Sequence, residues 1–93
     1  MASNFHITSY KFEDSLYLRL SGDFDEGSAD ELINTITKNG TGSMDIFIDT
    51  NNLKTILPFN RDVFKKNFNR IKKTLKKPII IGVNKYKFEQ NLD

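Results

Sequence analysis

Hydrophobic and polar residues alternate along two early segments of the chain. Residues 5–12 alternate loosely, with an interruption near Thr8 and Ser9, and residues 16–20 alternate strictly between leucine and polar or aromatic side chains. A period of two is typical of β-strands with one buried face. Residues 13–15 between them form a short polar turn, so the two segments are predicted to pair as an antiparallel hairpin.

The pattern then changes to that of a helix. Residues 21–27 are expected to break the second strand, and a helix is predicted to begin at Ser28, which would cap it together with Glu31 three positions later. This helix should end near Asn39 and Gly40, because glycine commonly follows a helix C-terminus. Its apolar stripe consists of Leu32, Ile33 and Ile36.

A short apolar strand and a second helix are predicted next. Residues 44–49 resemble a strand in the interior of a sheet, whereas residues 50–57 are the least regular stretch. Pro58 suits the first position of a helix, where no amide hydrogen bond is needed, and this helix should run to about Lys76. Its apolar stripe is assigned to Phe59, Val63, Phe64, Phe68, Ile71 and Leu75. Phe59 is therefore expected to pack beneath the helix as a staple or core residue.

The last predicted strand follows Pro78. Residues 79–83 form the most strand-like run of the chain and are expected to be fully buried, and residues 85–93 could add a partial strand or a helical turn. The predicted order is β-β-α-β-α-β within a single domain, residues 1–93. Right-handed crossovers then give an α/β fold with a single-layer mixed sheet and its helices on one face. The other sheet face is left to water or to a partner.

Composition narrows the function classes. The 93 residues include no cysteine and one histidine, which excludes disulfides, thiolate zinc sites and a cysteine nucleophile. The sequence has no serine in a nucleophile-elbow motif and no evident general base to activate a nucleophile, so an enzyme is not expected. Neither a cofactor nor a metal is expected, although Asp23, Asp25 and Glu26 supply oxygen atoms, because their spacing lacks a complete cation-binding loop.

Charge is distributed unevenly along the chain. Residues 1–50 carry nine acidic against three basic side chains, a net −6, and residues 51–93 carry eleven basic against three acidic ones, a net +8. The basic cluster at residues 61–77 is interpreted first as a solvated helix face. Docking to an acidic protein or to another copy of the chain, and binding to nucleic acid or anionic lipid, are the alternatives. We expect no specific nucleic-acid partner, no membrane span and a cytoplasmic protein, and a homodimer remains open.

Several motifs, taken in order, resemble the STAS domains of sulfate transporters and anti-sigma factor antagonists. Residues 16–25 (LYLRLSGDFD) resemble the strand that ends at glycine and the acidic triplet after it, and residues 28–32 (SADEL) resemble the start of the first helix. Residues 46–49 (IFID) resemble the next strand, and residues 51–53 (NNL) the polar pair after it. The resemblance covers roughly residues 7–84 and implies a STAS-like fold and a protein-interaction role. The chain resembles a C-terminally shortened member of the family.

One departure from the family pattern bears directly on function. Antagonists of this family carry an Asp-Ser-Ser-Gly-like tetrapeptide before the second helix, whose first serine accepts phosphate. The equivalent residues here are 57–60, Leu-Pro-Phe-Asn, and Pro58 has no hydroxyl to phosphorylate. Thr55 is a weak alternative acceptor. No serine follows Ser43, so a small shift of the alignment restores no serine.

Two functional hypotheses follow from this resemblance. In the first, the chain is a non-catalytic, signalling-type module that binds an anti-sigma or kinase-like partner without serine phosphorylation. Its partner-binding residues would be Thr55, Leu57, Pro58, Phe59, Asn60 and Arg61. In the second, it is a small cytoplasmic accessory subunit of a lipid or anion transport system. Ligand sensing is a third, less favoured role.

Overall fold

A computed structural model describes residues 4–25, 27–40, 42–71 and 76–89. Its four strands are β1 (His6–Phe12), β2 (Ser15–Phe24), β3 (Asp45–Ile56) and β4 (Ile79–Ile81), and they lie side by side in the order β1-β2-β3-β4. β1 and β2 pair in antiparallel orientation, whereas β2–β3 and β3–β4 are parallel. The sheet is therefore mixed, as predicted.

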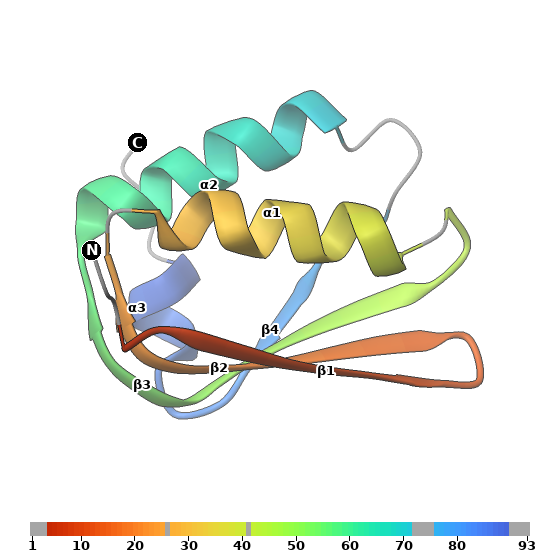
Figure 1. The fold of residues 1–93 in the computed structure, drawn as a ribbon, viewed down its shortest axis with the longest axis horizontal. Coiled ribbons are helices and arrows are strands. Elements are labelled where there is room, and N and C mark those ends of the chain that lie inside the picture. Colours follow the sequence, from red (N-terminus) through yellow and green to blue (C-terminus); the bar gives the residue numbers. More distant parts are fainter. Residues whose placement is uncertain (1–3, 26, 41, 72–75, 90–93) are drawn as a thin grey trace.

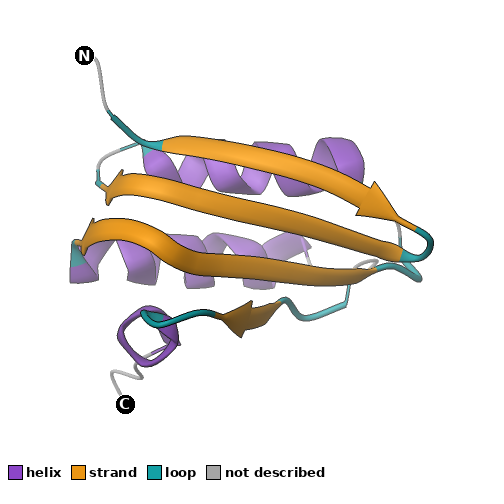
Figure 2. Cartoon of the chain, turned by 90° about the horizontal axis from the view of Figure 1, so that it is seen from below, coloured by secondary structure: helices purple, strands orange, loops and turns teal. Residues whose placement is uncertain are grey.

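Three described helices accompany the sheet: α1 (Ser28–Asn39), α2 (Pro58–Ile71) and the short α3 (Lys85–Glu89). Helices α1 and α2 lie side by side on one face of the sheet, and α3 lies beneath the first turns of α2 (Figure 1). The opposite face is bare of described helices (Figure 2). The predicted element order and the one-sided arrangement of the helices are thus confirmed.

The core lies between the sheet and this helix pair. Leu16 pairs with Ile46 and Leu18 with Ile48 across the two central strands, and all four side chains are fully buried. Burial of each such side chain stabilises the fold by about 1.5–3 kcal/mol. The helices cover them with further apolar side chains, namely Ala29, Leu32, Ile36, Phe64 and Phe68.

Two strands are longer than the sequence predicts. Residues 21–24 continue β2 instead of breaking it, and residues 50–56 continue β3. The residues there do not alternate regularly between apolar and polar side chains. The reason is that the pairing of β2 with β3 shifts register after Arg19 and again after Gly22. Gly22 adopts a positive φ of 85° and lies against the backbone of Asn4, so the irregular pairing depends on a residue without a side chain.

The bounds predicted for α1 are confirmed, but its capping is different. Gly27, with φ of 89°, is the N-cap residue, and no side chain caps the helix. Ser28 is instead the first helical residue and is buried; its hydroxyl accepts a hydrogen bond from the Asp25 amide at 3.0 Å. The predicted capping box with Glu31 is therefore wrong, because this hydroxyl binds the preceding loop.

The last strand also differs from the prediction. β4 has only three residues, and Ile79 is 44% exposed although Ile80 is buried. No described helix covers the opposite face of the sheet, so only the side chains on the helix face of the strand become buried. Residues 85–89 form the helical turn that was one of two alternatives. The predicted end of the second helix near Lys76 falls within residues 72–76, most of which lie outside the described residues.

The two faces of β2 should differ sharply in mutational cost. Leu18→Ala should lower the free energy of unfolding by about 2–5 kcal/mol, because it leaves a cavity in the core. Tyr17→Ala, one position away on the bare face, should cost less than half as much. Urea denaturation monitored by circular dichroism measures both values, and equal losses would contradict the assignment of the two faces.

Candidate partner-docking surface

The segment that joins β3 to α2 is held firmly against the end of β2. The Thr55 hydroxyl donates a hydrogen bond to Asp23 Oδ1 at 2.7 Å, and the Leu57 amide donates to the Phe24 carbonyl at 3.1 Å. Pro58 then begins α2, as its fixed φ and missing amide hydrogen predict. The rim formed by residues 55–59 is thus fixed by contacts to β2.

Two apolar side chains of this rim point into solvent. Leu57 is 46% exposed and Phe59 is 75% exposed. The expectation that Phe59 packs in the core is wrong. In an α-helix each residue turns by about 100°, so Phe59 points about 140° away from Phe64 and about 180° away from Phe68. Because Phe64 and Phe68 face the core, Phe59 faces outward.

Arg61, predicted to contact a partner, is instead a buried support. Its side chain is almost fully covered, and Nη1 donates to the Lys87 carbonyl of α3 at 2.8 Å. One turn later, Lys65 Nζ donates to the Glu89 carbonyl at 2.7 Å. Burial, and then the charge of Arg61, lower the pKa of Lys65 below its ordinary value. Two cations of the basic cluster therefore hold the end of α3, so that cluster is more than a solvated face.

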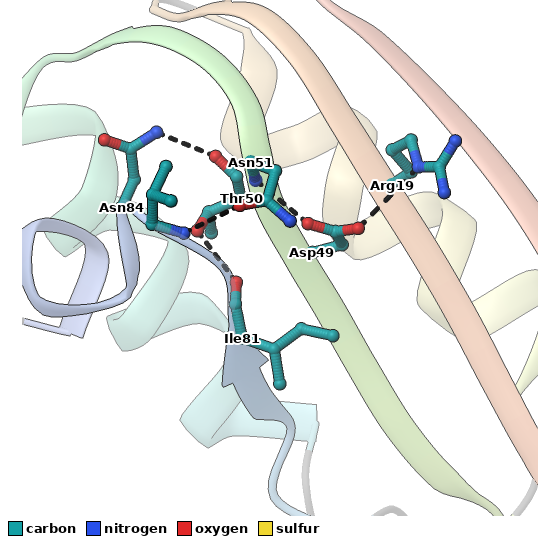
Figure 3. Close-up of polar contacts among 7 residues, drawn as sticks. Arg19, Asp49, Thr50, Asn51, Ile81 and Asn84 are labelled. Carbon is teal, nitrogen blue, oxygen red and sulfur yellow. Dashed lines mark hydrogen bonds and ion pairs between the residues drawn. The ribbon is translucent and has the colours of Figure 1, made fainter.

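The start of α3 is tied to β3 by a second set of hydrogen bonds, and Figure 3 draws those that involve Thr50 and Asn51. Asn84 Nδ2 donates to the carbonyls of Thr50 and Leu53 at 2.8 and 3.1 Å. The Val83 amide donates to Asn51 Oδ1 at 2.8 Å, and the Thr50 hydroxyl donates to the Ile81 carbonyl at 2.8 Å. These contacts join β3, β4 and α3. Through Arg61, they also support the first turns of α2 that present Phe59.

The acidic residues considered as cation ligands are engaged in hydrogen bonds within the described part of the chain. The Asp23 and Asp25 carboxylates accept hydrogen bonds from Thr55 and Ser28, respectively. Glu26 lies outside the described residues, as does the side chain of Asn60. Within the described part of the chain, no group of three His, Asp or Glu side chains could hold a metal ion. None of its helices has the length and apolar character needed to cross a membrane.

A cavity of about 400 Å³ lies between α2, β4 and α3, away from the predicted site. Phe64, Phe68, Ile80 and Phe88 provide its apolar wall, and Lys65 and Lys77 add two cations. The sequence analysis did not find this cavity. The only sequence feature that could have indicated the cavity was the spacing of the phenylalanines, and that spacing is equally typical of a closed core.

These observations define a class of fold: a mixed four-stranded sheet with two crossover helices on one face. A solved structure shares this architecture. It is a protein of the DUF3478 family from Shewanella loihica PV-4, described as uncharacterized and as having a SpoIIAA-like fold, with a TM-score of 0.56 and 20% sequence identity over 88% of this chain and 72% of that one. The chain thus has the SpoIIAA-like fold, that of STAS domains and anti-sigma factor antagonists, which confirms the predicted resemblance at the level of the fold.

Comparisons by sequence add no family. A scan against protein-family models and a search of curated proteins both find no match to this chain.

Loss of the Arg61 contact should loosen α3. Arg61→Met keeps the aliphatic stem but leaves the Lys87 carbonyl without its buried donor, so stability should fall by about 1–3 kcal/mol. Amide hydrogen exchange should accelerate in α3 while α1 stays protected. Arg70→Met, at an exposed position of the same helix, is the control and should change neither value.

Gly82 should tolerate alanine worse than Gly27 does. Both have a positive φ, of 106° and 89°, so alanine costs about 1–2 kcal/mol of backbone strain at either site. At Gly82 the added methyl group would also lie 2.8 Å from the Asn51 amide nitrogen and from Thr50 Oγ1, whereas at Gly27 it meets no atom within 4 Å. The urea midpoint of Gly82→Ala should therefore be the lower of the two. Equal midpoints would mean that Asn51 and Thr50 can move away from the added methyl group without lowering the stability of the fold.

Proposed function

We propose that this chain is a non-catalytic protein-interaction module that docks a regulatory protein through residues 55–60 and the first turn of α2. The observation that carries the proposal is the exposed Phe59, which stands beside Leu57 on a rim fixed by hydrogen bonds. Aromatic side chains dominate the energetics of protein interfaces. A rim that is already ordered loses little conformational entropy when it binds.

The SpoIIAA-like fold supports the same proposal at the level of an anti-sigma-antagonist-like module. A serine-phosphorylation switch has no chemical basis at Pro58, which lacks a hydroxyl. The Thr55 hydroxyl, three residues earlier, is held by Asp23. Binding would therefore be constitutive or controlled elsewhere, for example by the amount of the partner.

The test compares two phenylalanines of nearly equal exposure on different parts of the surface. Phe59→Ala removes the proposed anchor, and Phe12→Ala removes a phenylalanine of nearly equal exposure, 74%, at the β1–β2 hairpin. Wild-type and both variant proteins serve as baits in lysate of the native host, and each recovered protein is then titrated as a purified partner. Phe59→Ala should weaken binding by about 2 kcal/mol, roughly 30-fold, and Phe12→Ala should leave it unchanged.

The identity of the partner separates the two hypotheses. An anti-sigma factor or kinase-like ATPase that depends on Phe59 would support the regulatory role. A transporter subunit that depends on Phe59 would keep the docking surface but assign the chain to a transport complex. A partner that binds both variants as tightly as the wild type would overturn the site.

A further inference from the structure

The bare face of the sheet carries a continuous row of large apolar side chains. In the strand register, Tyr10 of β1 lies opposite Tyr17 of β2, Tyr17 opposite Phe47 of β3, and Phe47 opposite Ile79 of β4. Ring centroids are 6.4 Å apart for Tyr10–Tyr17 and 5.1 Å for Tyr17–Phe47. Phe12 adds a further ring in the next row, beside the hairpin turn. No described helix covers this row (Figure 2).

A second row on the same face, two residues further along β2 and β3, carries side chains of opposite charge. Thr8, Arg19, Asp49 and Ile81 lie opposite one another across β1 to β4. Arg19 Nε is 3.7 Å from Asp49 Oδ2 (Figure 3). The Arg19 guanidinium carbon lies 6.0 Å from the ring centre of Tyr10. The arginine is on β2 and the aspartate on β3, so the charges stand symmetrically about the centre of the sheet.

We propose that this face binds a second copy of the same chain, with the two sheets packed face to face around a two-fold axis. The axis would run parallel to the strands, midway between β2 and β3. Rotation about such an axis keeps each residue at its own level along the strands and exchanges β2 with β3 and β1 with β4.

This symmetry makes both rows complementary to themselves. In the apolar row, Tyr17 of one copy meets Phe47 of the other, and the outer residues Tyr10 and Ile79 meet likewise. In the charged row, Arg19 of each copy meets Asp49 of the other, so four charges form one network. A closed dimer in which each contact occurs twice is the commonest form of homo-oligomer. Packed sheets tolerate the angle of about 30° that their twist imposes.

The charges also decide against a polyanion as the occupant. Arg19 is balanced by Asp49, and Asp45 of the same face by Lys76, whose Nζ lies 3.1 Å from Asp45 Oδ1. A nucleic acid needs an excess of cations to release its counterions. A second copy needs only the balanced pairs that are present.

The area of the bare face sets the expected affinity of the dimer. Seven residues on each of β1, β2 and β3, together with the three residues of β4, cover roughly 400 Å² at the usual strand and residue spacings. This is on the order of half the area that each partner buries in a standard interface. The dimer should therefore be weak and reversible, and it leaves the rim at residues 55–59 outside the contact.

Charge reversal gives a test that a monomer cannot imitate. Sedimentation velocity over a concentration range of about 10 µM to 1 mM should show wild-type chains passing from monomer to dimer. Arg19→Asp alone places like charges opposite each other in the dimer, as does Asp49→Arg alone, so each should weaken association by about tenfold or more. An equimolar mixture of the two variants should recover it, because every aspartate of one chain then meets an arginine of the other.

Circular dichroism and thermal melts confirm that each variant is folded. Should Asp49→Arg fail to fold, Tyr17→Ser tests the same face without touching Asp49, and Phe59→Ala is the control that should associate like wild type. Wild-type chains that remain monomeric throughout, or a mixture that fails to recover, would overturn the proposal. A fluorescent single-stranded oligonucleotide is titrated in parallel. Its binding by a monomeric wild type, and its loss in Tyr17→Ser, would assign the face to nucleic acid instead.

Discussion

The parallel pairing of β2 with β3 is the constraint on which the rest of the structure depends. These two strands form the centre of the sheet, and their register places Leu16 beside Ile46 and Leu18 beside Ile48. Side chains alternate between faces along a strand, so that register also fixes what the other face carries. A slip of one residue would exchange the core with the bare face.

Long-range hydrogen bonds transmit this order to the proposed docking rim. β3 holds the start of α3 through Asn84, and α3 in turn meets the buried Arg61 of α2. Leu57 and Phe59 are therefore exposed on a supported edge and not on a free loop. Hydrogen bonds between segments that are distant in the sequence hold these two side chains in their exposed positions.

The sequence predicted the parts of the fold that depend on local pattern. The leucines of β2, the bounds of α1 and the start of α2 at Pro58 all follow from periodicity and from backbone chemistry. It failed where a neighbouring strand decides the conformation, as in residues 50–56, whose polar side chains conceal a strand. The prediction also failed for Phe59. Apolar residues form one stripe on a helix only if the rotation of about 100° per residue brings them to the same side, and Phe59 lies on the side opposite Phe68.

By itself, the sequence determined the order of the elements, the absence of a phosphorylatable hydroxyl at position 58 and the apolar residues available for a core. Only the tertiary structure decided that Arg61 is a buried support, that Phe59 faces outward, and that Tyr10, Tyr17, Phe47 and Ile79 stand in one row. The physical reason is that strand register and helix docking join residues distant along the chain. A local pattern shows which face of an element a residue occupies, but not which residues of other elements lie beside it.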